Sequence, residues 1–187
     1  MYSSWNLSKS SAGVSIRFLT NTSNLKVKWE VINDFSMDHM PDTGIKGVDL
    51  YFKNGGKWQY INTGRPQGFF NEYTLVENMD VVMREFKIFL PLYDGVKNIE
   101  IGIDSTSSIE KPSKNSKKPI IFYGTSITQG GCASRPGMAH TNIMSRQLDI
   151  DVYNFGFSGN CRMEQPIAEL ISTIEPALYI IECMPNM

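Results

Sequence analysis

A serine that lies shortly after an apolar run is the residue of this sequence best placed to do chemistry. The run is Ile120–Tyr123, and Gly124-Thr125-Ser126-Ile127-Thr128 comes next. If the run is a buried strand, Ser126 lies at its carboxyl end, where open α/β sheets bind ligands and where a following helix aims N–H groups at an anion. The position suits a nucleophile, and it equally suits a serine that caps the helix.

Three segments together resemble the sequence blocks of the SGNH hydrolases, the GDS-type esterases and lipases. Gly124–Thr128 is similar to the first block, usually Gly-Asp-Ser-Ile-Thr, including its place after a buried strand. The segment Asn154–Asn160 resembles the second block, which centres on a glycine after the second strand. Met184-Pro185-Asn186 stands where the third block supplies an asparagine. The resemblance covers Pro119 to Met187.

The resemblance implies a carboxylic ester hydrolase that forms an acyl-enzyme. Ser126 would be the nucleophile, and its own N–H, the Gly159 N–H and the Asn186 side-chain amide would form the oxyanion hole. Acyl transfer builds negative charge on the carbonyl oxygen, and each preorganised donor removed costs on the order of 10² to 10³ in rate. Some carbohydrate-active members of the family carry an N-terminal sandwich, so the resemblance suggests an acetylated carbohydrate as substrate, with no cofactor or metal.

The sequence departs from the family pattern at two places. Thr125 replaces the usual aspartate of the first block, and no Asp-x-x-His, the block that supplies the base and its orienting carboxylate, occurs anywhere. Of the two histidines, His140 falls on a helix and suits a structural role, whereas His39 is a loop residue that could touch substrate. Loss of a triad histidine costs about 10⁶ in turnover. We therefore predict a truncated hydrolase that is nearly inert alone, within a protein extending for roughly another hundred residues.

Other polar residues near these blocks permit two interpretations each. Arg135 and Arg162 follow the first and second blocks, so either could bind an anionic group of the substrate or form a surface salt bridge.

The cysteines are odd in number and include no Cys-x-x-Cys pair, which predicts neither a disulfide framework nor a zinc site. They are Cys132, Cys161 and Cys183.

The first hundred residues have the pattern of an antiparallel β-sandwich. Apolar and polar residues alternate over short runs, and turn signals such as Asn21–Asn24 and Asn54–Gly56 separate the runs. Many short strands without a long helical pattern are typical of a jelly-roll-like sandwich. The expected strands are Val14–Phe18, Leu25–Val31, Val48–Lys53, Lys57–Ile61 and Ile99–Ile103.

A change of pattern divides the chain into a sandwich at 1–110, a linker at 111–118 rich in Ser, Lys and Pro, and an α/β segment at 119–187. The last segment has β-α-β-α-β order and predicts the N-terminal half of a flavodoxin-like parallel SGNH domain. Its three strands alone would leave edges and faces uncovered. The expected elements are strand Ile120–Tyr123, helix Met138–Leu148, strand Asp151–Phe155, a helix starting near Pro166 and strand Leu178–Ile181.

Composition and charge limit the kinds of partner that the chain is expected to bind. The net charge is -1 and the basic residues are scattered, so neither nucleic acid nor a membrane surface is an expected partner, and a small-molecule or carbohydrate ester is. No apolar run approaches the roughly 18 residues that span a bilayer, and no signal-peptide core follows Met1. Carbohydrate-active relatives suggest the periplasm or export.

Two other functions compete with ester hydrolysis. A glycan-binding sandwich with a degenerate hydrolase remnant would explain the missing base, although a pure binding scaffold has no need for Ser126, Gly159 and Asn186 together. Trp5, Trp29 and Trp58 could stack on sugars, although the alternating run around Trp29 favours a core position. A nucleotide-binding domain is disfavoured, because neither Gly-x-Gly-x-x-Gly nor a P-loop follows the first strand of the α/β segment.

Overall fold

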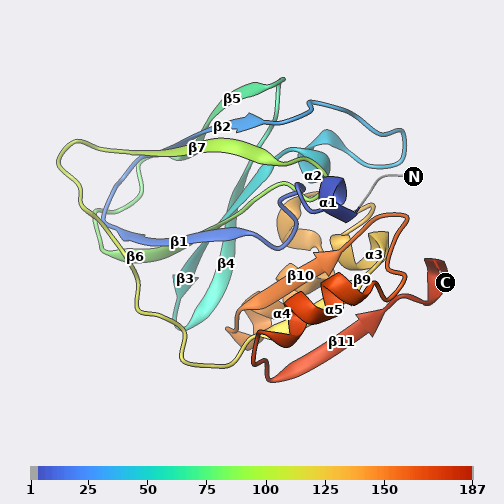
Figure 1. Ribbon diagram of the computed structural model, residues 1–187. Helices are drawn as coiled ribbons and strands as arrows, with labels where there is room; N and C mark the ends of the chain where they lie inside the picture. The colour runs from blue at the N-terminus through green and yellow to red at the C-terminus, as the bar shows by residue number, and fades with distance from the viewer. Residues whose placement is uncertain (1–3, 187) are drawn as a thin grey trace.

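The computed structural model describes residues 4–186, which form an antiparallel β-sandwich followed by a small parallel α/β unit (Figure 1). One sheet of the sandwich has five strands in the order β4-β3-β6-β1-β8, and the other has three in the order β5-β2-β7. The strands are β1 (Ser15–Thr20), β2 (Leu25–Val31), β3 (Val48–Asn54), β4 (Lys57–Gly64), β5 (Phe70–Val76), β6 (Arg84–Phe89), β7 (Val96–Ile103) and β8 (Ile109–Glu110). The predicted sandwich is confirmed.

The sandwich encloses a continuous apolar core. Along β2 the residues alternate between buried and exposed, which is the pattern predicted for a half-buried strand. Leu50 and Ile88 are fully buried opposite this face, and Trp29 is only 2% exposed, which confirms its predicted core position. The indole Nε1 of Trp29 donates a hydrogen bond of 2.9 Å to the carbonyl oxygen of Lys46, so its polar atom is satisfied inside the core.

Sequence periodicity did not reveal every element of the sandwich. The strands β5, β6 and β8 were not predicted, and neither were the one-turn helices α1 (Ser4–Leu7) and α2 (Asp42–Ile45). Phe86 through Phe89 are buried without alternation. One face of β6 meets the sandwich core, and on the other Lys87 Nζ lies 3.4 Å from the hydroxyl of Ser145 in the α/β unit. A strand covered on both faces shows no period of two.

The α/β unit has the predicted β-α-β-α-β order, with the sheet order β10-β9-β11. Placing the first strand between the second and the third is how a flavodoxin-like sheet begins, which agrees with the expected N-terminal half of such a domain. Its elements are β9 (Ile120–Gly124), α3 (Ser126–Gln129), the 3₁₀ turn η1 (Pro136–Met138), α4 (His140–Leu148), β10 (Val152–Gly156), α5 (Gln165–Ser172), β11 (Leu178–Glu182) and the 3₁₀ turn η2 (Met184–Asn186).

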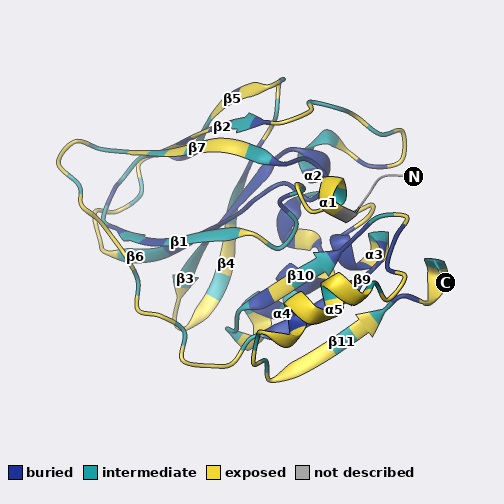
Figure 2. Ribbon diagram, in the orientation of Figure 1, coloured by how far each residue is buried: buried dark blue, intermediate teal, exposed yellow. Residues whose placement is uncertain are grey.

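The sheet of the α/β unit is covered unevenly. Every residue of β9 is buried, whereas β11 forms an open edge on which Leu178 and Ile181 are 52% and 59% exposed. Leu170 of α5 is exposed as well, and Figure 2 shows α5 and β11 largely in yellow. The uncovered edge agrees with the expectation of a partial hydrolase domain. No helix among residues 4–186 has the length and apolarity needed to cross a membrane.

A buried carboxylate on β3 joins the sandwich to the α/β unit. Asp49 is fully buried and accepts hydrogen bonds from the hydroxyl of Thr63 at 2.6 Å, from Arg135 Nη1 at 2.7 Å and from the Gly137 N–H at 2.7 Å. A Cβ on Gly137 would lie 2.2 Å from the hydroxyl of Tyr51, so only glycine fits this close approach. We call Asp49, Thr63, Arg135 and Gly137 the Asp49 clasp. It holds the segment that follows the Ser126 turn.

Candidate active site

Ser126 lies in a tight turn between β9 and α3. Gly124 ends the strand, and a Cβ there would lie 2.0 Å from Thr128 Oγ1, so the turn needs glycine at this position. Thr125 is the N-cap of α3, and its hydroxyl accepts a hydrogen bond from the Ile127 N–H at 3.3 Å. Ser126 is the first helical residue. Because the capping position belongs to Thr125, the alternative of a capping serine does not describe Ser126.

A carboxylate from the neighbouring strand holds this turn to the sheet. Glu182, the last residue of β11, accepts hydrogen bonds through Oε2 from the hydroxyl of Thr125 at 2.8 Å and from that of Thr128 at 3.1 Å. It also accepts one from the Thr125 N–H at 3.2 Å. The threonine that replaces the usual aspartate of the first block is therefore paired with a carboxylate supplied by another element.

The strand register brings the three sequence blocks to one edge of the sheet. Gly124 is the register partner of Gly156 on β10 and of Glu182 on β11, so the three loops start at the same level. The second loop is tied to the turn, because the Phe157 N–H donates to the carbonyl oxygen of Gly124 at 2.9 Å. The third loop is tied to the second, because Asn186 Nδ2 donates to the carbonyl oxygen of Asn160 at 2.6 Å.

Two backbone donors at this edge are unused. Among residues 4–186, neither the Ser126 N–H nor the Gly159 N–H donates a hydrogen bond. Gly159 is exposed, has a φ of +71°, and would have no atom within 4 Å of an added Cβ, so its backbone conformation and not space favours glycine. The Asn186 amide has two N–H groups, and the hydrogen bond to Asn160 occupies one of them. Backbone and amide N–H groups that point to one position can stabilise an oxyanion.

Neither histidine reaches Ser126 in the described part of the chain. His140 begins α4 and packs edge-to-face on Phe122, with ring centroids 5.5 Å apart. Burial lowers its pKa, although the Glu182 carboxylate opposes this shift. Its packing fits the structural role predicted for it. His39 is exposed in the turn closed by the bridge between Met37 and Met40, so a contact with substrate remains a prediction.

The structure corrects the prediction about cysteines. Cys161 and Cys183 form a disulfide across 22 residues, with their Cα atoms 5.2 Å apart, and Cys132 is free and exposed. The odd number of cysteines concealed the pair, because the partners become neighbours only when the loops after β10 and β11 meet. Cys161 follows Gly159 by two residues and Cys183 precedes Asn186 by three. The bond therefore joins the two loops that carry these candidate donors.

The two arginines differ in their surroundings. Arg135 belongs to the Asp49 clasp and also donates to the hydroxyl of Tyr51 at 2.7 Å. Burial opposes the charge on Arg135, but Asp49 and Tyr51 outweigh this effect and raise its pKa. Arg162 is exposed beside the disulfide. Within residues 4–186, no group of three or more His, Cys, Asp or Glu side chains is arranged to hold a metal ion.

The sequence contains a signal for Asp49, which was not among the predicted site residues. Gly47-Val48-Asp49-Leu50-Tyr51 holds the clasp carboxylate and the tyrosine that contacts Arg135. A charged residue inside an apolar strand is rarely fully buried unless it is paired, so Asp49 was a candidate for a long-range partner. Nothing in its neighbourhood along the chain identified Arg135.

Fold and site together define an SGNH-type hydrolase unit preceded by a β-sandwich. Two family models divide the chain between them. The model described as the N-terminus of SGNH-hydrolase-type esterases, named GxDLY, matches residues 2–109, and the model of the GDSL-like lipase/acylhydrolase family matches 117–187. The name GxDLY describes the segment Gly47-Val48-Asp49-Leu50-Tyr51, which contains the carboxylate of the Asp49 clasp. The chain belongs to the family of SGNH-hydrolase-type esterases.

Solved structures agree with this assignment. A protein from Bacteroides ovatus that has been assigned as a GDSL-like lipase is 40% identical and superposes with a TM-score of 0.93, and the match covers 100% of this chain and 56% of that protein. A comparison with curated protein sequences gives no match.

Two more distant structures share the fold. The salicylyl-acyltransferase SsfX3 from a tetracycline biosynthetic pathway is 19% identical with a TM-score of 0.73, and the match covers 91% of this chain and 47% of that one. A family two carbohydrate esterase from Clostridium thermocellum in complex with cellohexaose is 12% identical with a TM-score of 0.65, and here the shares are 95% and 61%. The chain spans about half the length of the structures it matches.

Proposed function

We propose that this chain supplies the nucleophile and the oxyanion hole of a serine carboxylic ester hydrolase. The observation that carries the proposal is the register of the parallel sheet, which starts the loops of Ser126, Gly159 and Asn186 at one edge. Two of the three donors expected to hold the oxyanion, the N–H groups of Ser126 and Gly159, have no acceptor among the described residues. A scaffold that only binds would have no reason to retain this arrangement.

In this mechanism the Ser126 hydroxyl attacks the carbonyl carbon of the ester as a base removes its proton. The carbonyl oxygen becomes negative in the tetrahedral intermediate and accepts hydrogen bonds from Ser126, Gly159 and Asn186. The alcohol leaves with a proton, and water then hydrolyses the acyl-enzyme and restores the serine. The turn geometry held by Glu182 and the disulfide between the neighbouring loops would keep the donors in place before the substrate arrives.

The general base is expected from outside the described residues. Neither His140 nor His39 hydrogen-bonds to Ser126 here, and the chain lacks the Asp-x-x-His block. We propose that the 187-residue chain is almost inactive alone and that a longer form of the protein supplies the base. Carbohydrate esterases among the structural neighbours support an acetylated carbohydrate as substrate, with Arg162 and His39 as proposed contacts at the rim.

Hydrolysis of p-nitrophenyl acetate tests the proposal. The assay compares the 187-residue chain, any longer form encoded by the same reading frame, and the Ser126→Ala variant of each. We expect turnover that depends on Ser126 in the longer form, and a loss on the order of 10² to 10³ when Asn186 becomes Ala in that form. Turnover unaffected by Ser126→Ala would refute the nucleophile.

A glycan-binding function is the second candidate. The missing base supports it, and Trp5 and Trp58 are the sandwich tryptophans outside the core, the former 73% exposed. Binding of neutral cello-oligosaccharides together with an absence of Ser126-dependent turnover in every form of the protein would favour this function over hydrolysis.

A further inference from the structure

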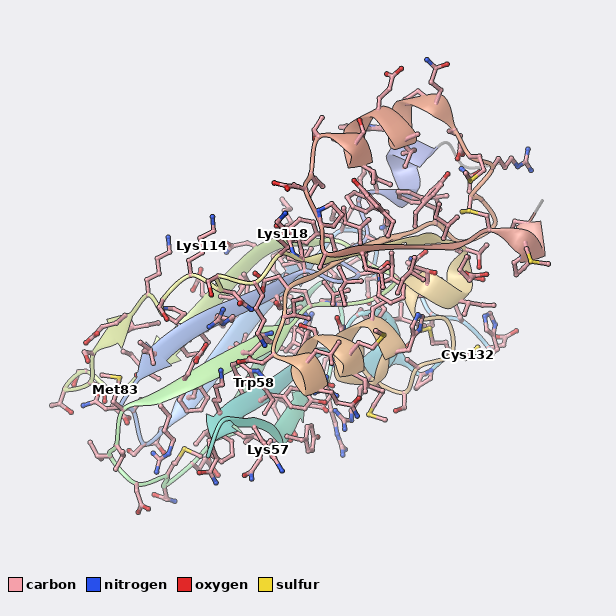
Figure 3. All side chains as sticks on the ribbon, turned by 90° about the horizontal axis from the view of Figure 1, so that it is seen from below. Lys57, Trp58, Met83, Lys114, Lys118 and Cys132 are labelled. Atoms are coloured by element: carbon pink, nitrogen blue, oxygen red, sulfur yellow. A yellow bond between two sulfur atoms is a disulfide. The ribbon has the colours of Figure 1, made fainter. Side chains whose placement is uncertain are left out.

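A pocket lies between the sandwich and α4, apart from the three loops that carry Ser126, Gly159 and Asn186. It has a volume of about 490 Å³, and Trp58 and Tyr60 of β4, with Arg135 and Arg146 of the α/β unit, form part of its wall. Figure 3 shows Lys57 and Trp58 beside α4, well separated from Cys132 near the Ser126 turn. The mechanism proposed above uses no side chain of this pocket.

Positive charge predominates in this pocket. Its charged lining residues are Lys57, Arg135 and Arg146, and no carboxylate lines it. Arg135 is neutralised by the buried Asp49 behind the wall. Within residues 4–186, by contrast, no carboxylate oxygen lies within 4 Å of Lys57 Nζ or of the Arg146 guanidinium. Among the described residues, the Arg146 guanidinium and the exposed Lys57 ammonium group therefore form no direct ion pair, and Asp49 is paired with Arg135.

Arg146 is fixed in place without being neutralised. Its Nη1 donates to the carbonyl oxygens of Gly137 at 2.7 Å and Asn142 at 3.1 Å, and its guanidinium carbon lies 4.1 Å from the ring centroid of Tyr51. Burial and the nearby charge of Arg135 lower its pKa, whereas Tyr51 and the Asp49 carboxylate oppose this shift without cancelling it. Because arginine stays protonated in proteins, a partly buried guanidinium without a direct ion pair raises the free energy of the empty site. An anionic ligand would offset that cost.

Aromatic rings complete the wall. Tyr60 is 46% exposed and lies under Arg135, whose guanidinium carbon is 4.0 Å from the ring centroid. The indole of Trp58 is oriented by a hydrogen bond of 2.9 Å from Nε1 to Asp149 at the end of α4. Rigid aromatic side chains offer apolar contact area at low entropic cost. A ring-shaped ligand that carries one acidic group fits such a pocket.

We propose that this pocket binds a carboxylated sugar, a uronate unit of an acidic oligosaccharide. Its carboxylate would pair with Arg146 and Lys57, and its ring would contact Tyr60 and Trp58. The preference for an anion stands on the charges of the pocket, whereas the choice of a sugar rests on the proposed function as a carbohydrate esterase. The planar fork of Arg146 suits a carboxylate, because guanidinium and carboxylate groups pair through two parallel hydrogen bonds.

Isothermal titration with an oligogalacturonate, against the same oligosaccharide with its carboxylates methyl-esterified, tests the proposal on the 187-residue chain. We expect the acid to bind about tenfold more tightly than the ester, with binding that weakens as salt is added. Equal affinity for acid and ester, or no binding of the acid, would overturn the proposal.

Variants assign any binding to this pocket. Arg146→Gln should weaken binding of the acid about tenfold. Since Arg146 also bonds the turn before α4, Lys57→Glu is a second test at an exposed position that needs no repacking. It should weaken binding at least as much as Arg146→Gln, because it places a negative charge beside the carboxylate. The control Lys97→Ala, on β7 and paired with Glu30, should bind as the wild type does, and unchanged affinity in both pocket variants would contradict the assignment.

Ser126→Ala separates this proposal from the proposed esterase function. Titration measures binding and not hydrolysis, so the variant should bind the acid like the wild-type chain. Failure of the uronate to bind would leave Ser126-dependent ester hydrolysis untouched, whereas intact binding with no Ser126-dependent hydrolysis in any form of the protein would refute the esterase alone.

Discussion

The sandwich buries its apolar side chains more completely than the α/β unit does. In the sandwich, two sheets cover each other, and residues such as Leu50 and Ile88 are fully buried. In the α/β unit β9 is covered, but β11 leaves Leu178, Tyr179 and Ile181 exposed. The candidate chemistry therefore lies in the less covered unit, which the Asp49 clasp holds to the better-packed one.

The largest effect is expected when the connection between the two units is broken. Asp49→Asn removes the charge that neutralises Arg135 inside the interface, and loss of one partner of a buried ion pair costs about 4 kcal/mol. We expect the free energy of unfolding in urea to fall by this amount, and proteolysis of the segment 126–139 to accelerate. The control Asp42→Asn removes an exposed partner of Lys46 and should change stability by less than about 1 kcal/mol. Equal effects of the two variants would mean that the clasp does not join the units.

Truncation of one isoleucine in each unit compares their packing directly. Ile88→Ala deletes a fully buried side chain from the sandwich and should cost about 3 kcal/mol. Ile181→Ala, at a position 59% exposed on β11, should cost less than about 1 kcal/mol. Chemical denaturation measures both. A large loss for Ile181→Ala would show that the open edge of β11 is covered in solution.

The disulfide is expected to compensate in part for the poor cover of the α/β unit. Replacing both Cys161 and Cys183 by Ser removes a cross-link that closes a loop with a sequence separation of 22 and should cost about 2 kcal/mol. Added dithiothreitol should destabilise the wild-type chain equally and leave the double variant unchanged. Cys132→Ser, at the free and exposed cysteine, is the control and should be neutral. Insensitivity of the wild type to dithiothreitol would contradict the bond.

A smaller effect, dependent on pH, is expected at the interface of β6 with α4. Burial, followed by the charge of Arg17, lowers the pKa of Lys87 to about 8 from its ordinary value of 10.5. The unfolded chain therefore binds more protons than the folded one between these values, so stability should rise as the pH rises from 8 towards 9.5, by about 1 kcal/mol. Lys87→Met should flatten this slope in urea denaturation, and Lys97→Met should not. An unchanged slope in Lys87→Met would assign the effect to another group.

Local patterns predicted the parts of the fold that depend on neighbours in sequence. The alternation in β2 and the order of elements after Pro119 led to the sandwich and the parallel unit. The strand β6 was not predicted. Because α4 covers its outer face, its residues are buried without alternation. Periodicity reports how a strand is covered, and it fails where tertiary contacts cover both faces.

The candidate site also has residues that were predicted from the sequence and contacts that were not. Ser126, Gly159 and Asn186 were predicted from the resemblance of three segments to the family's blocks, and the parallel register starts the loops that carry them at one edge. The disulfide and the Asp49 clasp depend on contacts between residues far apart in the chain, and Asp49 and Arg135 are 86 residues apart. No local pattern encodes those pairings, although an aspartate inside an apolar strand indicates that a partner from elsewhere in the chain must neutralise it.

Mass spectrometry of the protein after brief exposure to p-nitrophenyl acetate can show directly whether Ser126 is the nucleophile. The form used is the one that shows turnover, quenched in acid and digested before analysis. We expect an acetyl group on the peptide that contains Ser126 and none there after Ser126→Ala. Acetylation confined to other residues, with hydrolysis that survives Ser126→Ala, would contradict it.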